Sequence, residues 1–562
     1  MKKESFATLY TAEGEALSGQ PWTIYPRPQM KRNSFFCLNG EWDFYANGGE
    51  KERILVPFPP ESALSGIGRR LEKFPGVKYR RKFTLPEGFV RGRVLLHFGA
   101  VDQTAAVFLN GHEVGTHVGG YDAFSFDITE FLQDENELTV GCIDDLESHI
   151  LPYGKQREKR GGMWYTPVTG IWQTVWIESV PEQYVKSLKI DTGRDYVQIS
   201  VDGVCDGVVT VQTPDGEITS RLADSTARLQ IRNPRLWSPE DPYLYEFKIT
   251  AGEDEISSYF ALRTLEIKEV DGLPRLCLNG KPYFFHGLLD QGYYSDGIYT
   301  PASPENYTRD IAEMKALGFN TLRKHIKVEP EHFYCECDRL GMIVFQDMVN
   351  NGDYSFLRDT ALPTVGIKKL SDRWMHRDKA TRKCFEDGMN ATVKQLQNHP
   401  CICYWTIFNE GWGQFNSAEM YETLKTLDSS RFIDATSGWF QGRKSDVESL
   451  HVYFKPVKIN PGDKPVVLSE FGGYSYQPQG HVFHPGKPYG YRFFEDRKKF
   501  EDALVELYEK EIIPALSRGL CGAIYTQVSD VEDETNGLLS YDRKVLKVSP
   551  EVMNKIAEKL KL

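Results

Sequence analysis

The fold of this chain is decided by residues 401–410, which read CICYWTIFNE. The first eight residues form a largely apolar run of strand length, and a polar pair, Asn409 and Glu410, follows it. Residues 465–470 repeat this design as PVVLSE and end in Glu470. Parallel barrels carry their chemistry at the carboxyl ends of their strands. The two runs therefore predict barrel strands that each present a glutamate at the mouth.

Strands alternate with helices throughout the region that contains both runs. Eight strands are predicted, at residues 283–288, 319–323, 342–347, 401–408, 431–435, 450–453, 465–469 and 521–528. Helices are predicted between them at 304–317, 379–397 and 500–516, the first of which has a Ser303 cap and an apolar face of Tyr307, Ile311, Met314 and Leu317. Eight strands with helical crossovers in about 290 residues predict a (β/α)8 TIM barrel over residues 272–562, with a doubly wound open sheet as the alternative.

The residues before the barrel predict two β-domains. Residues 1–180 contain short strands at 93–98, 104–109, 137–142 and 172–177, and Asn110-Gly111 is a hairpin signal because both positions tolerate positive φ. This pattern predicts a jelly-roll β-sandwich. Residues 181–271 predict an immunoglobulin-like β-sandwich with strands at 197–201, 208–213, 227–231 and 244–249. Asp271-Gly272 marks the expected boundary to the barrel.

Composition excludes several classes of protein. A chain of 562 residues needs two to four cores. Its net charge of -12 argues against a nucleic-acid partner, and no stretch of about 18 apolar residues predicts a membrane span. Residues 1–5 carry two lysines without an apolar run behind them, so no secretory signal is expected.

The ten cysteines are scattered along the chain. Cys335/Cys337 and Cys401/Cys403 are spaced as alternate residues of a strand, which suits a shared core face better than a disulfide. No spacing suggests zinc. Reduced cysteines and a cytoplasmic location are expected, although a protein from which a signal had been removed would read in the same way.

The two glutamates fit one kind of chemistry. Glu410 ends the fourth predicted strand and Glu470 the seventh, so the side chains can face each other across the ring. Retaining glycoside hydrolysis needs two carboxyl groups about 5 Å apart, one to protonate the leaving oxygen and one to attack the anomeric carbon. Asn409 is placed to bind the 2-hydroxyl of the sugar. A single glutamate is more often part of a surface ion pair, but two at strand ends favour catalysis.

The chain resembles glycoside hydrolase family 2 over nearly its whole length. Beyond Asn409-Glu410, the matching motifs are residues 120–124 (GYDAF), 170–172 (GIW), 236–239 (LWSP), 242–245 (PYLY), 398–400 (NHP) and 469–472 (SEFG). The resemblance implies a jelly-roll sugar-binding domain, an immunoglobulin-like sandwich and a catalytic barrel. It also implies that Glu410 is the general acid/base and that Glu470 is the nucleophile.

Polar and aromatic residues at other strand ends are candidates for sugar binding. They are Asp290, Lys324, His325, Asp347, Asn409, Trp412, Trp439, His451 and Tyr453. Tyr453 resembles the family position whose hydroxyl contacts the nucleophile. The alternatives are structural: a loop tryptophan can cover core, and a strand-end histidine can bond a carbonyl.

The sugar itself stays open. A β-galactosidase-like exo-activity is the first expectation, and a β-uronidase (β-glucuronidase or β-galacturonidase) is the alternative. The Asn-x-Lys-Gly motif of familiar β-glucuronidases is absent. Residues 525–528 (YTQV) stand where many members of the family have a tryptophan in the eighth strand. The remaining cations that could bind a uronate are Lys324, Arg443, Lys487 and Arg492.

The remaining expectations concern class and partners. A non-catalytic carbohydrate-binding protein is the alternative from another class, and a transglycosylase differs only in how the intermediate is used. The expected partner is a carbohydrate, with no cofactor, no essential metal and a possible homo-oligomer.

Overall fold

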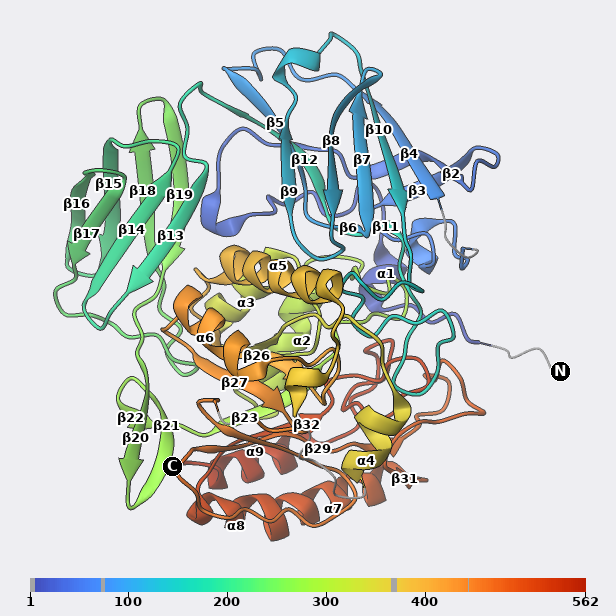
Figure 1. The fold of residues 1–562 in the computed structure, drawn as a ribbon, viewed down its shortest axis with the longest axis vertical. Coiled ribbons are helices and arrows are strands. Elements are labelled where there is room, and N and C mark those ends of the chain that lie inside the picture. Colours follow the sequence, from blue (N-terminus) through green and yellow to red (C-terminus); the bar gives the residue numbers. More distant parts are fainter. Residues whose placement is uncertain (1–5, 72–75, 365–370, 443) are drawn as a thin grey trace.

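The computed structural model describes residues 6–71, 76–364, 371–442 and 444–562. Two β-domains lie side by side at the top of Figure 1, and the barrel lies below them. The order is jelly-roll sandwich, immunoglobulin-like sandwich and barrel, as predicted.

The first domain packs a six-stranded antiparallel sheet on a four-stranded one. The large sheet has the order β3-β2-β4-β10-β7-β8, with bounds Glu52–Val56, Gly40–Ala46, Gly76–Phe83, Asn136–Ile143, Thr104–Leu109 and His112–Val118. The small sheet has the order β1-β12-β5-β9, with bounds Phe36–Cys37, Val175–Val180, Arg93–Phe98 and Phe124–Asp127. Asn110 and Gly111 form the predicted turn, both with positive φ. The strand predicted to begin at Trp172 begins at Val175, because Gly170–Ile171 (β11) pairs instead with Val101–Asp102 (β6).

The second domain is a seven-stranded sandwich. One sheet is β13-β14-β17, with bounds Ser187–Thr192, Tyr196–Asp202 and Thr226–Gln230. The other is β16-β15-β18-β19, with bounds Gly216–Leu222, Gly207–Thr213, Tyr245–Ala251 and Asp254–Phe260. Alternate residues face inward, so the core consists of aliphatic and aromatic side chains from both sheets.

A small sheet links this sandwich to the barrel. Its strands β20, β21 and β22 span Leu265–Val270, Leu273–Leu278 and Lys281–Pro282. Asp271 and Gly272 form the turn between β20 and β21, both with positive φ, so the boundary predicted there falls inside a hairpin. The buried Arg275 of β21 donates to the carbonyl oxygens of Leu516 and Leu520, which attaches the hairpin to the barrel.

Eight parallel strands form the barrel sheet, with the order β27-β26-β25-β24-β23-β32-β29-β28. In chain order from β23 the bounds are Phe285–Asp290 (β23), Thr321–Lys324 (β24), Ile343–Asp347 (β25), Ile402–Asn409 (β26), Phe432–Ser437 (β27), Glu448–Val452 (β28), Val466–Gly472 (β29) and Leu520–Thr526 (β32). All eight predicted strands are present. Between β27 and β28, the ring is joined by a hydrogen bond of 2.9 Å between Ser437 Oγ and His451 Nε2.

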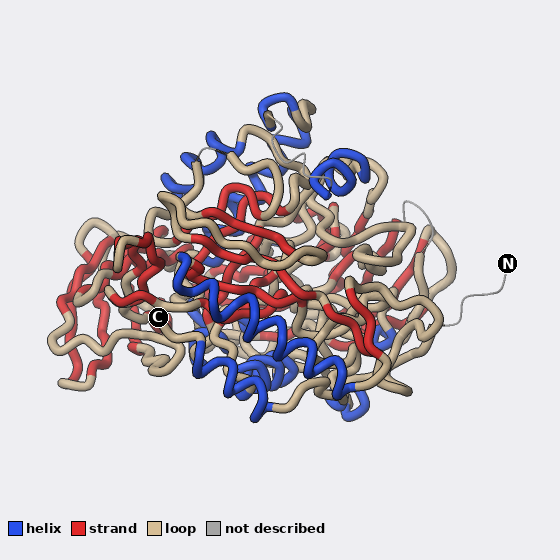
Figure 2. The backbone as a smooth tube through the Cα atoms, turned by 90° about the horizontal axis from the view of Figure 1, so that it is seen from below, coloured by secondary structure: helices blue, strands red, loops and turns tan. Residues whose placement is uncertain are grey.

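Helices surround the barrel strands (Figure 2). They are α2 (Glu305–Ala316), α3 (Glu331–Leu340), α5 (Lys379–Leu396), α6 (Ser417–Leu427), α7 (Arg497–Leu507), α8 (Ile513–Ala515) and α9 (Pro550–Lys559), with the single turn α4 (Leu362–Thr364) after β25. The predicted Ser303 cap is wrong: Pro304 is the N-cap, and Asn306 Oδ1 accepts the Ser303 N–H instead.

The remaining short elements complete the fold. The single helical turn α1 (Ala12–Ala16) follows the N-terminus, and the two short strands β30 (Tyr474–Tyr476) and β31 (Arg492–Phe494) pair in parallel after β29. The helix predicted at 500–516 begins at Arg497, where Asp496 caps it by accepting the Lys499 N–H, and a wide turn at Tyr508–Ile512 interrupts it.

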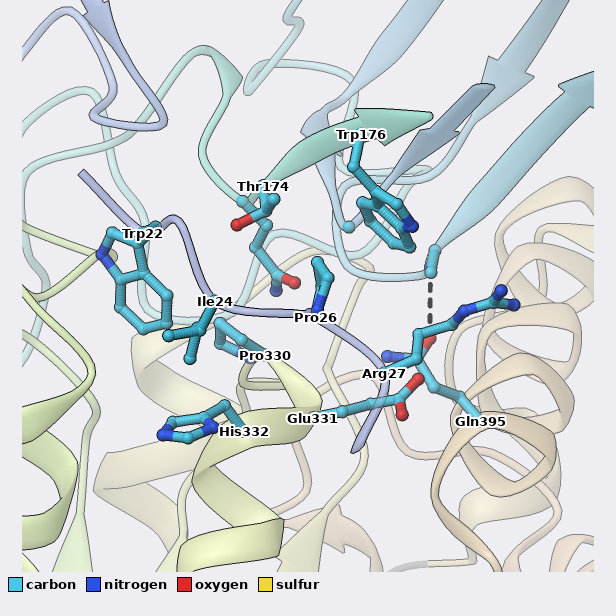
Figure 3. A pocket seen from close by; sticks show the side chains of 13 residues that line it. Trp22, Ile24, Pro26, Arg27, Thr174, Trp176, Pro330, Glu331, His332 and Gln395 are labelled. Carbon is cyan, nitrogen blue, oxygen red and sulfur yellow. Dashed lines mark hydrogen bonds between the residues drawn. The ribbon is translucent and has the colours of Figure 1, made fainter. Parts of the chain in front are cut away.

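An N-terminal segment joins the first domain to the barrel. Residues 22–27 run between the small sheet and helices α3 and α5 (Figure 3). Trp22 Nε1 donates to the Pro301 carbonyl oxygen at 2.8 Å, and the Gln395 amide oxygen accepts the Ala123 N–H at 3.1 Å. The two domains are therefore held in a fixed relation, which allows residues of the first to reach the barrel mouth.

All ten cysteines are free thiols. Cys401 and Cys403 are buried at the start of β26, as predicted, but Cys335 and Cys337 lie in helix α3 and not in a strand. None of the helices in the described ranges has the length and apolarity that a membrane crossing requires.

Candidate active site

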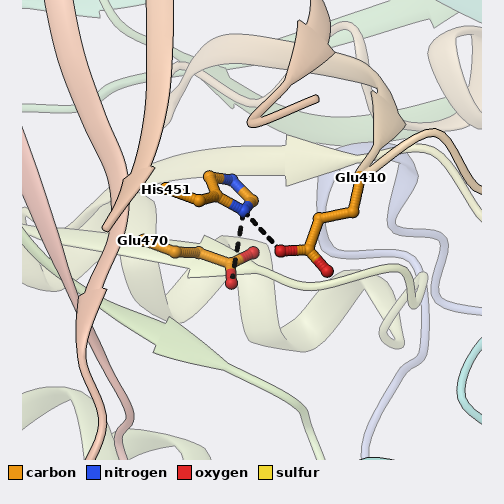
Figure 4. A group of neighbouring side chains, drawn as sticks. All are labelled: Glu410, His451 and Glu470. Atoms are coloured by element: carbon orange, nitrogen blue, oxygen red, sulfur yellow. Dashed lines mark hydrogen bonds and ion pairs between the residues drawn. The ribbon is translucent and has the colours of Figure 1, made fainter. Parts of the chain in front are cut away.

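Glu410 and Glu470 face each other at the carboxyl end of the barrel (Figure 4). Glu470 lies within β29 and is 4 % exposed. Glu410 follows β26 with φ of +51°, a left-handed conformation that costs a non-glycine residue on the order of 1–3 kcal/mol. Its N–H donates to the Ser437 carbonyl oxygen at 2.9 Å, which holds the unusual backbone in place. The conformation turns the Glu410 side chain towards Glu470.

His451 of β28 lies between the two carboxylates. Its Nδ1 is 2.8 Å from Glu410 Oε1 and 3.6 Å from Glu470 Oε2. One ligating atom from each of the three side chains lies within 4.8 Å of the others, so the two carboxyl groups have the spacing of a retaining glycosidase. The two carboxylate oxygens at Nδ1 are acceptors, so Nδ1 carries a proton, and Nε2 bonds to the Ser437 hydroxyl.

Arg323 of β24 organises the site. Its Nη1 donates to Glu470 Oε1 at 3.0 Å, its Nη2 to Asn409 Oδ1 at 2.9 Å and its Nε to Asp347 Oδ1 at 3.0 Å. The guanidinium is 1 % exposed and joins strands two, three, four and seven of the barrel. Asn409 is thereby oriented with its amide nitrogen free of acceptors among the described residues, as a contact to a sugar hydroxyl requires.

Glu470 is held in its ionised form. Burial raises its pKa, but His451, Arg323 and His325 together with the Tyr453 hydroxyl outweigh that effect and lower the pKa to about 2. Tyr453 donates to Glu470 Oε2 and lies 3.1 Å from Thr526 Oγ1. An ionised, oriented carboxylate is what a nucleophile needs at neutral pH.

Aromatic side chains form the walls around this pair. Trp412 follows Glu410, is 2 % exposed and stacks on Trp164 of the first domain at 5.1 Å between ring centroids. Tyr491 stacks on Tyr453 at 3.8 Å, and Trp439 lies 5.7 Å from the His451 ring. Stacked rings of this kind suit a sugar-binding cleft.

The first domain supplies part of the site. Residues 149–169 leave the sandwich and bind the loop after β25: the Tyr153 N–H donates to the Asn350 carbonyl oxygen at 3.1 Å, and the Gly352 N–H to that of His149 at 2.7 Å. This segment carries Lys155 and Trp164 to the barrel mouth. One side of the barrel mouth is therefore covered by residues of another domain.

The remaining predicted residues divide into two groups. His325 and Asp347 lie at the site and bond to each other, with His325 Nδ1 2.7 Å from Asp347 Oδ2. Lys324 instead binds Asp290 Oδ2 at 2.7 Å and Glu329 Oε1 at 2.9 Å over the ring of Phe333, a helix α3 residue. Within the described residues, neither Lys324 nor Asp290 contacts Glu410 or Glu470. The side chains of a strand alternate, so Arg323 and His325 face inward while Lys324 points outward.

The other cations named from sequence lie outside the catalytic network. Arg492 lies over the rings of Tyr474 and Phe494, and Lys487 is exposed. Arg443 lies outside the described residues.

Sequence reasoning missed Arg323, Lys155, Trp164 and Tyr491. The period-two alternation of strand residues could have found Arg323, because it pairs that position with His325. The other three lie on irregular segments whose course follows from tertiary packing, so no periodic signal marks them.

Two β-sandwiches followed by a parallel barrel with two facing glutamates define a three-domain carbohydrate-active architecture. Three sequence models of one family match in that order: the family 2 sugar-binding domain at residues 69–179, the family 2 domain at 188–263 and the family 2 TIM barrel domain at 269–538. The chain belongs to glycoside hydrolase family 2.

Curated relatives carry two names. A beta-galactosidase of Thermoanaerobacter pseudethanolicus is 26% identical over 441 residues, which cover 72% of this chain and 54% of that protein. A beta-glucuronidase of Felis catus is 27% identical over 493 residues, which cover 75% of this chain and 71% of that protein. The chain thus spans about half the length of the first relative.

Solved structures share the whole fold. The beta-D-glucuronidase of Dictyoglomus thermophilum superposes with a TM-score of 0.74 at 18% identity, covering 95% of this chain and 98% of that one. A family 2 beta-galacturonidase of Eisenbergiella tayi bound to galacturonate gives a TM-score of 0.69 at 19% identity, covering 96% and 98%.

Proposed function

We propose that the chain is a retaining exo-β-glycosidase that removes a terminal β-linked uronic acid. Glu470 attacks the anomeric carbon while Glu410 protonates the leaving oxygen, and water then hydrolyses the glycosyl-enzyme with Glu410 as base. The expelled group is the alcohol or phenol to which the sugar was attached.

The observation that carries the reaction is the environment of the two glutamates. Glu470 is fixed by Arg323 and Tyr453 with a pKa of about 2, whereas Glu410 bonds among the described side chains to His451. The Glu470 carboxylate is thus held ionised and oriented, as a nucleophile requires. Such an asymmetric pair separates the roles of nucleophile and acid/base.

Exo-action is supported by the segment of the first domain that covers one side of the barrel mouth. Residues 149–169 bind the loop after β25, and their Trp164 stacks on Trp412. A cleft that is walled in this way fits the end of a glycoside better than the middle of a chain.

A uronide is preferred to the galactoside expected first from sequence. Relatives named beta-glucuronidase, from Felis catus and Canis lupus familiaris, align over 75% and 74% of this chain and over 71% and 70% of their own lengths. The relative named beta-galactosidase aligns over a smaller share of its own length, and β-galactoside hydrolysis is kept as the second candidate. A cytoplasmic location and a homo-oligomer stay predictions.

A panel of nitrophenyl β-glycosides tests the proposal. It includes the glucuronide, galacturonide, galactoside, glucoside, mannoside and arabinopyranoside, with Glu470→Gln as the inactive control and Glu410→Gln as a strongly impaired variant. We expect turnover of a uronide to exceed that of every neutral glycoside and proton NMR to show the β-anomer as the first product. Preference for a neutral sugar would refute the substrate class, and the α-anomer as first product would refute retention.

A further inference from the structure

Lys155 reaches the catalytic cleft from the first domain, and its backbone position is fixed. Gly154, with φ of +64°, lies so close to the barrel that an added Cβ would be 3.0 Å from the Ile326 carbonyl oxygen and 2.9 Å from the Tyr121 hydroxyl. The Lys155 carbonyl oxygen accepts the Tyr165 N–H at 3.0 Å. The side chain therefore leaves a fixed point beside the segment that follows β24 of the barrel.

The ammonium of Lys155 is buried without a counter-ion. The residue is 7 % exposed, and within the described residues no carboxylate oxygen lies in ion-pair distance of its Nζ. The ammonium lies over the face of Trp412, with Nζ 4.7 Å from the ring centroid. A buried charge normally has a paired partner because its desolvation is costly, so an unpaired one marks a place where a ligand charge belongs.

The surroundings place this ammonium in the catalytic cleft. Trp412 lies two residues after Glu410, and the carboxylates of Glu534, Glu470 and Glu410 are the acidic groups that act on Lys155. Burial lowers the pKa of Lys155, and these three carboxylates oppose that effect. Glu534 is already occupied: it accepts hydrogen bonds from the Tyr165 hydroxyl and from Asn536 Nδ2.

We propose that Lys155 binds the carboxylate of the uronic acid and so determines the preference for a charged sugar. This inference rests on the proposed function. In a pyranose the carboxyl group is borne by C5, which is joined to the reacting C1 through the ring oxygen. A cation that binds this carboxylate must therefore lie near the catalytic pair, and Lys155 is near enough for Glu470 and Glu410 to act on it.

Three other cations near the site are engaged. Arg323 is shared among Glu470, Asn409 and Asp347, and Lys324 is held by Asp290 and Glu329. Arg160 pairs with Glu532 and Asp533. Among these four cations, Lys155 of the first domain is the one without a carboxylate partner in the described residues.

The test compares uronides with neutral glycosides in variants of Lys155. Lys155→Met removes the charge and keeps the length, Lys155→Arg keeps the charge, and Lys159→Met is the matched control because Lys159 lies exposed in the same segment. We measure kcat/KM for the nitrophenyl β-glucuronide, β-galacturonide, β-glucoside and β-galactoside, together with the melting temperature of each variant.

Loss of one charge-assisted contact should lower uronide kcat/KM of Lys155→Met about 10- to 100-fold. Neutral glycosides should be hydrolysed at the wild-type rate or faster, Lys155→Arg should keep most of the uronide preference, and Lys159→Met should behave as wild type. If Lys155→Met does not fold, Lys155→Gln provides the neutral variant.

Two other outcomes overturn the inference and are distinguishable. If the wild type prefers uronides and Lys155→Met keeps the same ratio of uronide to neutral turnover, Lys155 does not read the carboxylate, but the proposed function stands. If the wild type shows no uronide preference, the proposed substrate class fails together with the inference, and the wild-type panel alone reveals it.

Discussion

The guanidinium of Arg323 lies with Nη1 3.0 Å from Oε1 of Glu470, both side chains being nearly inaccessible to solvent. The contact joins the second and seventh strands across the barrel, and the same arginine holds Asn409 and Asp347. The orientation of Glu470 and the integrity of the barrel mouth thus depend on one side chain. Changes at this network should affect both activity and stability.

Acid should destabilise the wild type more than a variant without the Glu470 charge. The pKa of Glu470 is about 2 in the fold against an ordinary 4.5, so its stabilising contribution is present above pH 4.5 and disappears as the pH falls towards 2. Between pH 6 and pH 3 the wild type should lose about 2 kcal/mol that Glu470→Gln does not. Melting temperatures of both proteins across this range measure the difference, and parallel curves would contradict the assignment.

Asp347→Ala should destabilise the barrel strongly. The substitution leaves Arg323 and His325 without their shared acceptor in a site that is almost completely buried. Breaking a buried ion pair by removing one partner costs about 3–5 kcal/mol. Calorimetry should show a lower melting temperature of the barrel, while Asp387→Ala, at an exposed ion pair of helix α5, should change it little.

Tyr453→Phe should lower kcat with little loss of fold. The ring keeps its stacking on Tyr491, but the hydrogen bond from the hydroxyl to Glu470 Oε2 is lost. Hydrogen bonds to charged groups contribute about 1.5–3 kcal/mol, so kcat should fall about 10- to 100-fold. The pKa of Glu470 should also rise, which would move the acidic limb of the pH–rate profile to higher pH. An unchanged profile with a lower melting temperature would indicate a structural role alone.

The sequence was sufficient to predict the architecture because strands and helices produce periodic patterns of apolar residues. Apolar runs of strand length define all eight barrel strands, and the count of strands places Glu410 opposite Glu470. The Asn110-Gly111 turn was likewise readable, since few other residues adopt positive φ at both positions. The absence of the Ser303 cap could not be predicted, because it depends on the Asn306 side chain, which accepts the Ser303 N–H in the folded structure.

The residues of the candidate site could be predicted from the sequence only in part. His325 and Asp347 were found as strand ends, whereas Lys324 points out of the barrel because neighbouring strand residues face opposite ways. Lys155 and Trp164 reach the site from a loop some 250 residues before Glu410, and such a contact depends on how two domains pack. Local sequence carries no signal for it.

Glu410→Gln should slow substrates according to their leaving group. A general acid contributes about 10²–10⁴-fold when the leaving oxygen needs a proton, and much less when it departs readily as an anion. Methyl uronides should therefore lose nearly all turnover, while dinitrophenyl uronides should still form the glycosyl-enzyme and then accumulate it. A pre-steady-state burst measures the accumulation, and azide, which attacks the glycosyl-enzyme without needing a base, should accelerate the steady state that follows the burst. Equal losses for both substrates would contradict the assignment of Glu410 as the acid/base.

Gly154→Ala should impair the site from outside the barrel. At φ of +64° an alanine is strained, and its Cβ would lie 3.0 Å from the Ile326 carbonyl oxygen, a backbone atom that cannot move freely. The segment that carries Lys155 must then shift away from β24, whereas Glu410, Glu470 and Arg323 keep their positions on the barrel strands. Uronide kcat/KM should fall more than neutral glycoside kcat/KM, in the same direction as in Lys155→Met.

Gly480→Ala is the control, since the φ of Gly480 is also positive but nothing lies within 4 Å of the added Cβ. Equal effects of the two glycine substitutions would show that backbone strain alone, and not displacement of Lys155, lowers the activity.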